Sequence, residues 1–231
     1  MKIFNNITII APHPDDEILG CGGTIAKYIK KGAKVKTIIL TKGISSRYEN
    51  FDENVKKLQS KLIKTSKLAN RIIGVKNLNF YNLEDNQFDN KSLLTLIKIL
   101  EKEIKNFKPN KIFTHFINDL NIDHQYTSRA VLTAARPEYY NSVSEIIFFE
   151  INSSTDYQIN SNGMQFQPNL FVDISKTLDL KKKSLNFYNS EMKKYPHTRS
   201  IKAVINKNIS RGNSVGLKAC EAFQIIRKIE K

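Results

Sequence analysis

The chain has no tryptophan and only two cysteines, Cys21 and Cys220, among its 231 residues. Two cysteines provide no disulfide framework, so a small disulfide-stabilised secreted fold is excluded and we expect a cytoplasmic protein. No apolar run approaches the roughly 20 residues that a membrane-spanning helix needs. The first apolar run does not read as a signal peptide, because it ends at Asp15 and Asp16 without a small-residue cleavage site. We expect residues 1–231 to form a single domain.

Acidic residues are scarce relative to basic ones, since 22 Asp and Glu stand against 37 Lys and Arg, a net charge of +15. An excess of this size favours anionic partners. The lysines, however, alternate with apolar positions, as in KYIKKGAKVK and KILEKEIKNFK, which is typical of the solvated face of a helix. We therefore expect no specific nucleic-acid partner. Attraction to an anionic substrate and peripheral contact with a membrane remain open, and we expect a homo-oligomer.

Hydrophobic periodicity alternates between strand-like and helix-like segments. The strand-like runs are 7–11, 34–40, 77–83, 111–116, 145–151 and 169–174. The helical patterns are 23–30, 54–73, 92–107, 124–135, 178–192 and 216–229. This alternation predicts a Rossmann-like α/β fold, with a mostly parallel twisted sheet and helices on both faces. The polar segment 152–168 is expected to be a loop or hairpin insertion.

Polar side chains follow the predicted strands at the points where the strands end. Ligands of open α/β sheets bind beyond the carboxyl ends of the strands, so these side chains are candidates for one site. Three of the four histidines fall at this edge, namely His13, His115 and His124. The other polar residues at strand ends are Asp15, Asp16, Arg47, Asp85 and Glu150.

The stretch APHPDDE places a histidine and three carboxylates directly after the first strand. Pro14 stiffens this turn, so that His13 and Asp16 can point at one position. With His124 they make a set of two nitrogens and one oxygen, which is usual for catalytic zinc with a position left open for water. Asp15 remains as a carboxylate close enough to take a proton from that water.

Each residue alone also has an ordinary structural interpretation. A single loop histidine is usually solvated, and His115 could be a core histidine at the end of a strand. Asp85 and Asn86 could be turn formers, and Cys21 a small buried residue. The GCGG run at 20–23 lacks the spacing of a nucleotide-binding fingerprint, but it lets the following helix start close to the strand. The combination at strand ends favours the metal site over these alternatives.

The segment APHPDDEILGCGGTIAKYIKKG resembles the first motif of the LmbE-like, or PIG-L, family of zinc-dependent N-acetylglucosaminyl deacetylases. The resemblance continues through VKTIILTKG, KPNKIFTHFINDLNIDH and the tail from YPHTRS onward. It implies one zinc ion per chain on His13, Asp16 and His124, with Asp15 as general base and Asp123 of the DH pair among the catalytic residues. The implied reaction removes the N-acetyl group of an amino sugar or its glycoconjugate through attack by a metal-bound water.

One departure from the family concerns the residue that stabilises the oxyanion. Many members have His-Pro-Asp-His where this chain has NIDH, so Asn121 replaces a histidine. Asn121 can donate an amide hydrogen bond but cannot act as an acid. His197, in YPHTRS, is the favoured alternative because an imidazolium supplies both charge and a proton. The expected substrate-binding residues are Arg47, Asp85, Glu150 and Arg199, and Arg211 could join Arg199 in meeting a phosphate.

Two other functions remain as alternatives at this point. In a divalent-metal phosphohydrolase or glycosyltransferase, Asp15 and Asp16 would hold magnesium on a phosphate group. The histidines disfavour this, since magnesium prefers oxygen ligands. In a non-catalytic basic binding domain, the aligned site residues would be a coincidence.

Overall fold

The computed structural model describes residues 6–138, 142–158 and 165–230. Its strands are β1 (Asn6–Ala11), β2 (Lys34–Thr41), β3 (Asn77–Leu83), β4 (Lys111–His115), β5 (Glu145–Phe149), β6 (Leu170–Asp173) and β7 (Cys220–Lys228). Its α-helices are α1 (Asp16–Lys30), α2 (Glu53–Ile72), α3 (Leu93–Phe107), α4 (Ile122–Ala134), α5 (Leu178–Phe187) and α6 (Ile201–Asn213), and the short 3₁₀ turns are Ser45–Arg47 and Phe88–Asn90.

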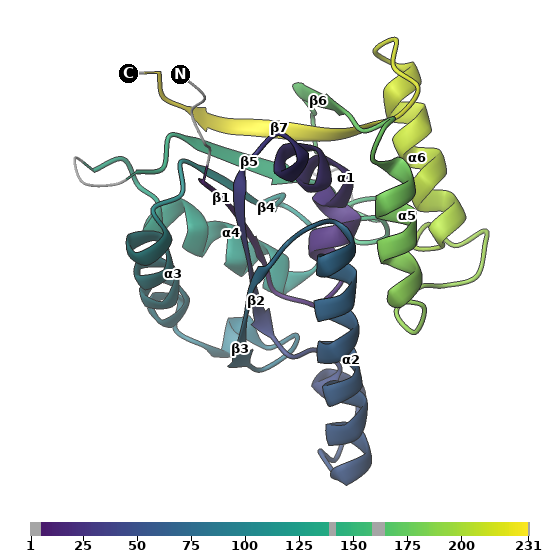
Figure 1. Ribbon diagram of the computed structural model, residues 1–231. Coiled ribbons are helices and arrows are strands. Elements are labelled where there is room, and N and C mark those ends of the chain that lie inside the picture. The colour runs from purple at the N-terminus through teal and green to yellow at the C-terminus, as the bar shows by residue number, and fades with distance from the viewer. Residues whose placement is uncertain (1–5, 139–141, 159–164, 231) are drawn as a thin grey trace.

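The strands form one sheet in the order β3-β2-β1-β4-β5-β7-β6. The first five strands in this order, β3, β2, β1, β4 and β5, run parallel to one another, whereas β7 is antiparallel to both β5 and β6. Helices cover both faces (Figure 1), and the prediction of a mostly parallel Rossmann-like sheet is confirmed. Strands β1, β2, β4 and β5 are almost entirely buried, which explains their apolar runs, whereas β3 at the edge of the sheet is partly exposed.

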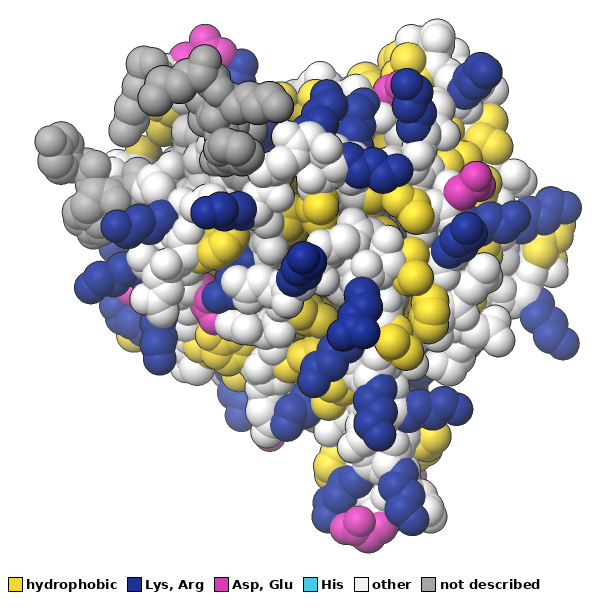
Figure 2. All heavy atoms as spheres, in the orientation of Figure 1, with side chains coloured by type: hydrophobic (Ala, Val, Ile, Leu, Met, Phe, Trp, Pro, Cys, Tyr) yellow, Lys and Arg dark blue, Asp and Glu magenta, His cyan; other side chains and the backbone are white. Residues whose placement is uncertain are grey.

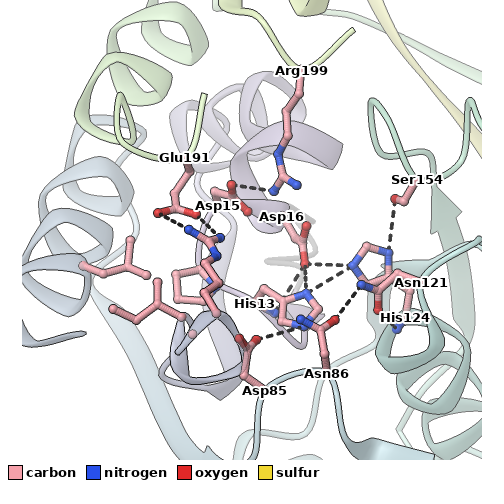
Figure 3. Close-up of a pocket in the computed structure, with 15 residues that line it drawn as sticks. His13, Asp15, Asp16, Asp85, Asn86, Asn121, His124, Ser154, Glu191 and Arg199 are labelled. Carbon is pink, nitrogen blue, oxygen red and sulfur yellow. Dashed lines mark hydrogen bonds and ion pairs between the residues drawn. The ribbon is translucent and has the colours of Figure 1, made fainter. Parts of the chain in front are cut away.

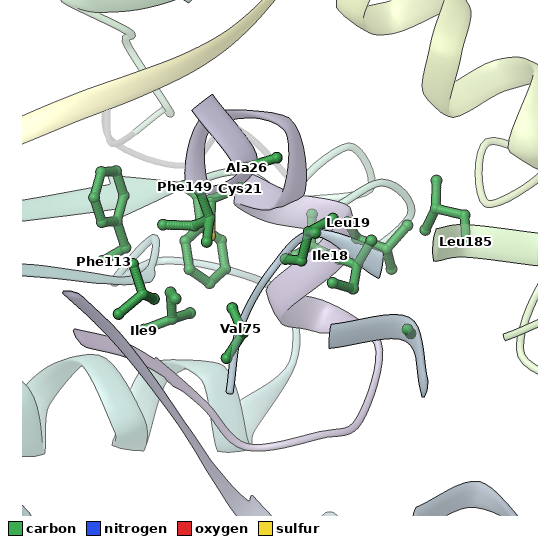
Figure 4. Close-up of a cluster of buried hydrophobic side chains, with 14 of the residues drawn as sticks. Ile9, Ile18, Leu19, Cys21, Ala26, Val75, Phe113, Phe149 and Leu185 are labelled. Atoms are coloured by element: carbon green, nitrogen blue, oxygen red, sulfur yellow. The ribbon is translucent and has the colours of Figure 1, made fainter. Parts of the chain in front are cut away.

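The sheet separates two hydrophobic cores. One core joins the sheet to α1, α2, α5 and α6, and the other joins it to α3 and α4. In the first core, Cys21 and Ala26 of α1 pack over Ile9, Phe113 and Phe149 of the sheet (Figure 4). Cys21 is thus a small buried residue, and both cysteines are free thiols.

Glycines of α1 allow the helix to lie very close to its neighbours. A Cβ atom at Gly20 would lie 2.3 Å from a ring carbon of Phe149, and one at Gly23 would lie 2.9 Å from a methyl carbon of Ile174. No side chain fits at these distances, so the approach depends on glycine. The expectation of close packing at the GCGG run is met, although the helix starts at Asp16 rather than at 23.

A buried ion pair joins the two halves of α1. The helix is broken at Cys21, where the backbone has φ −145° and ψ 16°. Glu221 of β7 accepts hydrogen bonds from the backbone N–H groups of Gly23 and Thr24, at 3.0 and 2.7 Å. Lys181 of α5 donates to the Leu19 carbonyl at 2.7 Å and to Glu221 at 2.6 Å. The pair therefore satisfies the backbone groups that the break exposes.

The C-terminal segments differ most from the predictions. The predicted helix 216–229 is wrong, because Cys220–Lys228 is strand β7, between β5 and β6. Its first four residues, CEAF, are all buried, so the segment shows no alternation of apolar and polar positions that would indicate a strand. Helix α6 was not predicted, and α5 ends at Phe187, short of 192. Within the expected insertion 152–168, the described residues form turns and irregular structure, and 159–164 lie outside the described residues.

Basic side chains are spread over the surface. Figure 2 shows Lys and Arg side chains dispersed across the visible face, over several elements. This distribution agrees with the solvated helix faces expected from the sequence. Within the described ranges, no helix is both long and apolar enough to span a membrane.

Removing one member of the buried ion pair should destabilise the fold strongly. Glu221→Ala leaves the Lys181 ammonium, which is 1% exposed, without its carboxylate. We expect a loss of about 3–5 kcal/mol in the free energy of unfolding, measured by urea denaturation. Lys98→Ala, which breaks a surface pair with Glu101, should cost less than about 1 kcal/mol. Equal losses for the two variants would show that the buried pair does not support α1.

Candidate metal centre

The site lies in the crevice between β1 and β4. These strands are neighbours, but the chain continues from β1 to α1 on one face of the sheet and from β4 to α4 on the other. Such a switch point leaves an open crevice at the carboxyl ends of the strands. His13 and Asp16 follow β1, and His124 lies in the first turn of α4 (Figure 3). Sequence positions more than a hundred residues apart meet here because their strands are adjacent.

Three donor atoms form a nearly equilateral triangle. His13 Nδ1 lies 3.2 Å from Asp16 Oδ2 and 3.3 Å from His124 Nε2, and the latter two atoms are 3.3 Å apart. Ligands bound about 2.0–2.1 Å from a tetrahedral ion lie about 3.3–3.4 Å from one another. The two nitrogens and one oxygen therefore fit zinc in both spacing and chemistry.

In both imidazoles, a carboxylate contacts the ring nitrogen that faces away from the triangle. His13 Nε2 lies 3.0 Å from Asp123 Oδ2 and 3.4 Å from Asp85 Oδ1. His124 Nδ1 lies 3.0 Å from Asp119 Oδ1. Carboxylate partners of this kind fix which ring nitrogen faces a metal and make it more basic. In both rings the nitrogen directed at the triangle is thus left as the donor.

The surrounding charges favour a cation at the triangle. Burial opposes protonation of both imidazoles, but nearby carboxylates outweigh it and raise the pKa of His13 to about 10 and that of His124 to about 9. Burial alone would raise the pKa of Asp16, but His124 and His115 keep it well below its usual range. Asp119 behaves likewise, with its pKa lowered to about 2 by His124 against the effect of burial. The negative charge of these carboxylates stabilises positive charge placed among them.

Asp15 is held beside the triangle in a strained conformation. Its φ of 106° is rare for a residue with a side chain and costs about 1–3 kcal/mol. The fully buried side chain accepts a hydrogen bond from Arg199 on Oδ2 at 2.7 Å, whereas Oδ1 has no hydrogen-bond partner among the described residues. Burial raises the pKa of Asp15 to about 8, although Arg199 acts in the opposite direction. Asp15 thus has one anchored oxygen and one available for a proton.

A pocket of about 100 Å³ opens over the triangle and Asp15. Arg47 and Glu191 form an ion pair on one wall, and Asp85 accepts a hydrogen bond from the Ser46 hydroxyl at 2.7 Å on another. The remaining wall residues include Pro14, Gly43, Ile44, Leu62, Asn86, Asn121, Ser154 and Arg199. The pocket therefore combines polar groups with a small apolar side.

The two candidates for oxyanion stabilisation lie in different places. Asn121 caps α4 by accepting hydrogen bonds from Asp123 and His124 N–H groups, and it lines the pocket. Its Nδ2 donates to Asn86 at 2.9 Å. His197 is not among the described residues that line the pocket, and its Nδ1 accepts a hydrogen bond from the Arg199 backbone.

Other expected site residues also lie apart from the pocket. Glu150 forms ion pairs with Arg211 and Lys207 of α6, each at 2.9 Å, and neither Glu150 nor Arg211 is among the described wall residues. His115 is fully buried, with its ring stacked 3.7 Å from that of His124 and its Nε2 3.4 Å from Asp16 Oδ2. All three strand-end histidines are therefore together, but His115 faces the protein interior.

Sequence reasoning missed two functional positions of different kinds. Asp119 could have been found, because it lies on the same loop as Asn121 and His124, directly after β4. Glu191 carried no signal, since it falls within the helix predicted over 178–192 rather than at a strand end, whereas in the structure it follows α5. Its place in the pocket depends on how α5 packs against α1 and α2.

Comparison with known proteins places these features in a family. The family model for PIG-L, described as GlcNAc-PI de-N-acetylase, matches residues 8–135, more than half of the chain. Escherichia coli YaiS, an uncharacterized deacetylase, is 25% identical over 173 residues, 73% of this chain and 81% of YaiS. Diacetylchitobiose deacetylase of Thermococcus kodakarensis is 24% identical over 202 residues, 81% of this chain and 72% of that protein. The structure of N,N'-diacetylchitobiose deacetylase from Pyrococcus horikoshii has a TM-score of 0.74 at 24% identity and covers 98% of this chain and 85% of that one. Because the matched residues include both loops that supply the donor triangle, the chain belongs to the PIG-L family of de-N-acetylases.

Proposed function

We propose that this protein is a zinc-dependent hydrolase that removes the N-acetyl group from an amino sugar or a glycoconjugate of one. His13, Asp16 and His124 would hold one zinc ion per chain. The observation that carries the proposal is the triangle of donor atoms with 3.2–3.3 Å sides beside the buried Asp15 carboxylate. The deacetylase names of the relatives support the same chemistry.

Zinc, when bound, supplies a Lewis acid that polarises an amide carbonyl and lowers the pKa of water. Asp15 acts as general base through Oδ1, while Arg199 holds Oδ2 and fixes the direction of the carboxyl group. The same carboxyl returns the proton to the leaving nitrogen, which gives acetate and a free amine. Asp123 acts as a positioning residue, because it holds the imidazole of His13 from behind.

The size of the pocket limits which part of the substrate is enclosed. A volume of about 100 Å³ corresponds to about three water molecules at liquid density. This suits the acetamido group, so the sugar ring and whatever it carries lie at the mouth. Arg47, Asp85 and Arg199 on the walls can bind sugar hydroxyls or an anionic substituent.

The pocket geometry favours Asn121 over His197 as the oxyanion donor. Asn121 Nδ2 carries two hydrogens, and Asn86 accepts one of them. The second can be donated into the pocket that Asn121 lines. A hydrogen bond directed at developing negative charge typically contributes about 3 kcal/mol to transition-state stabilisation.

A magnesium-dependent phosphohydrolase or glycosyltransferase is a weaker proposal for the same residues. Two of the three clustered donors are imidazole nitrogens, which suit zinc better than magnesium. A screen for amine release from N-acetylated monosaccharides, disaccharides, nucleotide sugars and lipid-linked sugars tests the proposed reaction. Zinc-loaded protein inactive on all four classes, but active on a sugar phosphate, would favour the phosphohydrolase.

Each proposed ligand should be essential for metal binding. His13→Ala, Asp16→Ala and His124→Ala should each lose bound zinc and activity together, because three protein ligands leave no redundancy. Elemental analysis of purified protein measures this directly, with about one zinc per chain expected for the wild type. His197→Ala is the matched histidine control and should retain its zinc. Full zinc occupancy in a ligand variant would remove that residue from the set.

The general base should be separable from the ligands. Asp15→Asn should keep zinc but lose about 100-fold or more in kcat, since a positioned base contributes 10²–10⁴-fold. Zinc content and steady-state kinetics on the same preparation provide the measurement. Loss of zinc in this variant would instead make Asp15 a ligand and leave the base unassigned.

The two oxyanion candidates predict opposite rankings. Asn121→Ala should lower kcat more than His197→Ala, because Asn121 lines the pocket and His197 does not. Neither substitution should change zinc content. A larger loss for His197→Ala would restore the histidine as the donor and require the 195–200 turn to move toward the pocket on substrate binding.

A further inference from the structure

The third carboxylate of the PDDE turn has no place in the proposed chemistry. Glu17 is fully buried in the first turn of α1 and does not line the pocket within the described part of the chain. Its carboxylate nevertheless accepts three hydrogen bonds from groups that come from three different parts of the chain. A buried charge of this kind is expensive unless its partners are well placed.

The contacts divide between the two oxygens of Glu17. Oε2 accepts the backbone N–H of Asp15 at 2.9 Å. Oε1 accepts the Asn70 side-chain amide of α2 at 2.7 Å and the Tyr188 hydroxyl, directly after α5, at 2.6 Å. Asn70 is anchored in turn by donating to the Ser66 carbonyl at 3.0 Å. All three groups donate to Glu17, and a carboxylate, which accepts on both oxygens, satisfies them together.

The group held by Oε2 is the strained one. From the start of β1 to the end of α1, Asp15 is the only residue with a positive φ, and its peptide needs external support to keep that conformation. Its own carbonyl accepts the first two bonds of α1, from Ile18 and Leu19. The hydrogen bond from the Asp15 N–H to Glu17 fixes the amino side of the same residue. The two sets of hydrogen bonds together fix the direction of the Asp15 side chain.

We propose that Glu17, braced by Asn70 and Tyr188, is a positioning residue that holds Asp15 in its strained conformation and so aims its carboxylate at the substrate. This inference rests on the proposed role of Asp15 as base. It also connects the base to α2, through Asn70, and to the end of α5, through Tyr188.

Glu17→Gln tests the inference with little change in volume. The amide replaces one accepting oxygen with an NH₂ group, which cannot accept from the Asp15 N–H or from the Asn70 amide nitrogen, so one of these two contacts is lost. We expect kcat to fall about 10- to 100-fold, as small misplacements of catalytic groups do, with KM changed less than about threefold and zinc retained. Tyr188→Phe, which removes one brace, should give a smaller fall in kcat.

Glu103→Gln is the matched control. Glu103 is also buried and accepts hydrogen bonds from an asparagine, Asn79 at 3.0 Å, and a tyrosine, Tyr81 at 2.6 Å, as well as from Lys36. It lies toward the amino ends of β2 and β3, away from the pocket. Both variants should lower the thermal unfolding midpoint, but only Glu17→Gln should lower kcat. Equal kcat for Glu17→Gln and Glu103→Gln would overturn the inference.

Two further measurements separate this inference from the proposed reaction. In an Asp15→Asn background, Glu17→Gln should cause no further loss of kcat, whereas an additional loss as large as in the wild type would show that Glu17 does not act through Asp15. The amide proton resonance of Asp15 should move upfield in Glu17→Gln, because a neutral amide oxygen is a weaker acceptor than a carboxylate even where the contact survives, and it should stay unchanged in Glu103→Gln. An unchanged resonance in Glu17→Gln overturns the inference whether or not the enzyme is active on amino sugars, while an inactive wild type or an active Asp15→Asn overturns the proposed function.

Discussion

The balance of charge in the crevice between β1 and β4 constrains the rest of the structure. Carboxylates and imidazoles are buried there at separations near 3 Å. Because these groups are buried, water neither screens the repulsion between the carboxylates nor solvates their charges. A buried cluster of carboxylates is stable only when positive charge lies among them. Protons on His13 and His124 can supply it, and so can a divalent cation held by the same atoms. A site that takes up protons readily in this way is one that a metal can occupy by displacing them.

Helix α1 brings several of these groups into place at once. Its first turn carries Asp16 and Glu17, and its amide dipoles favour negative charge there. Gly20 lets that turn pack against Phe149, which lies beside the end of β4 in the sheet. The break at Cys21 then lets the second half follow the sheet without moving the first. The buried pair of α5 and β7 that bridges the break therefore helps to position Asp16, although it lies away from that residue.

The sequence was most informative where one short segment carries both a structural and a chemical signal. The order of strands and helices up to 135 follows from periodicity, and His13, Asp16 and His124 follow from the residues at strand ends. The C-terminal part was less predictable because a block such as CEAF is buried on both faces and reads equally well as helix or strand. Likewise, the ion pairs of Glu191 and Arg199 depend on tertiary packing, which leaves no local pattern.

The donors and the walls of the pocket do not all come from the same part of the chain. The donors and their supporting carboxylates all lie within residues 8–135, the part that the family model matches. Most wall residues lie in that part too, but Glu191 and Arg199 come from the segment between α5 and α6, outside it. The chemistry of the donor set requires fixed distances and tolerates little change, whereas the walls only have to complement one substrate. We therefore expect differences in substrate between this chain and its relatives to reside in the walls, to which the 188–200 segment contributes Glu191 and Arg199, the latter in contact with Asp15.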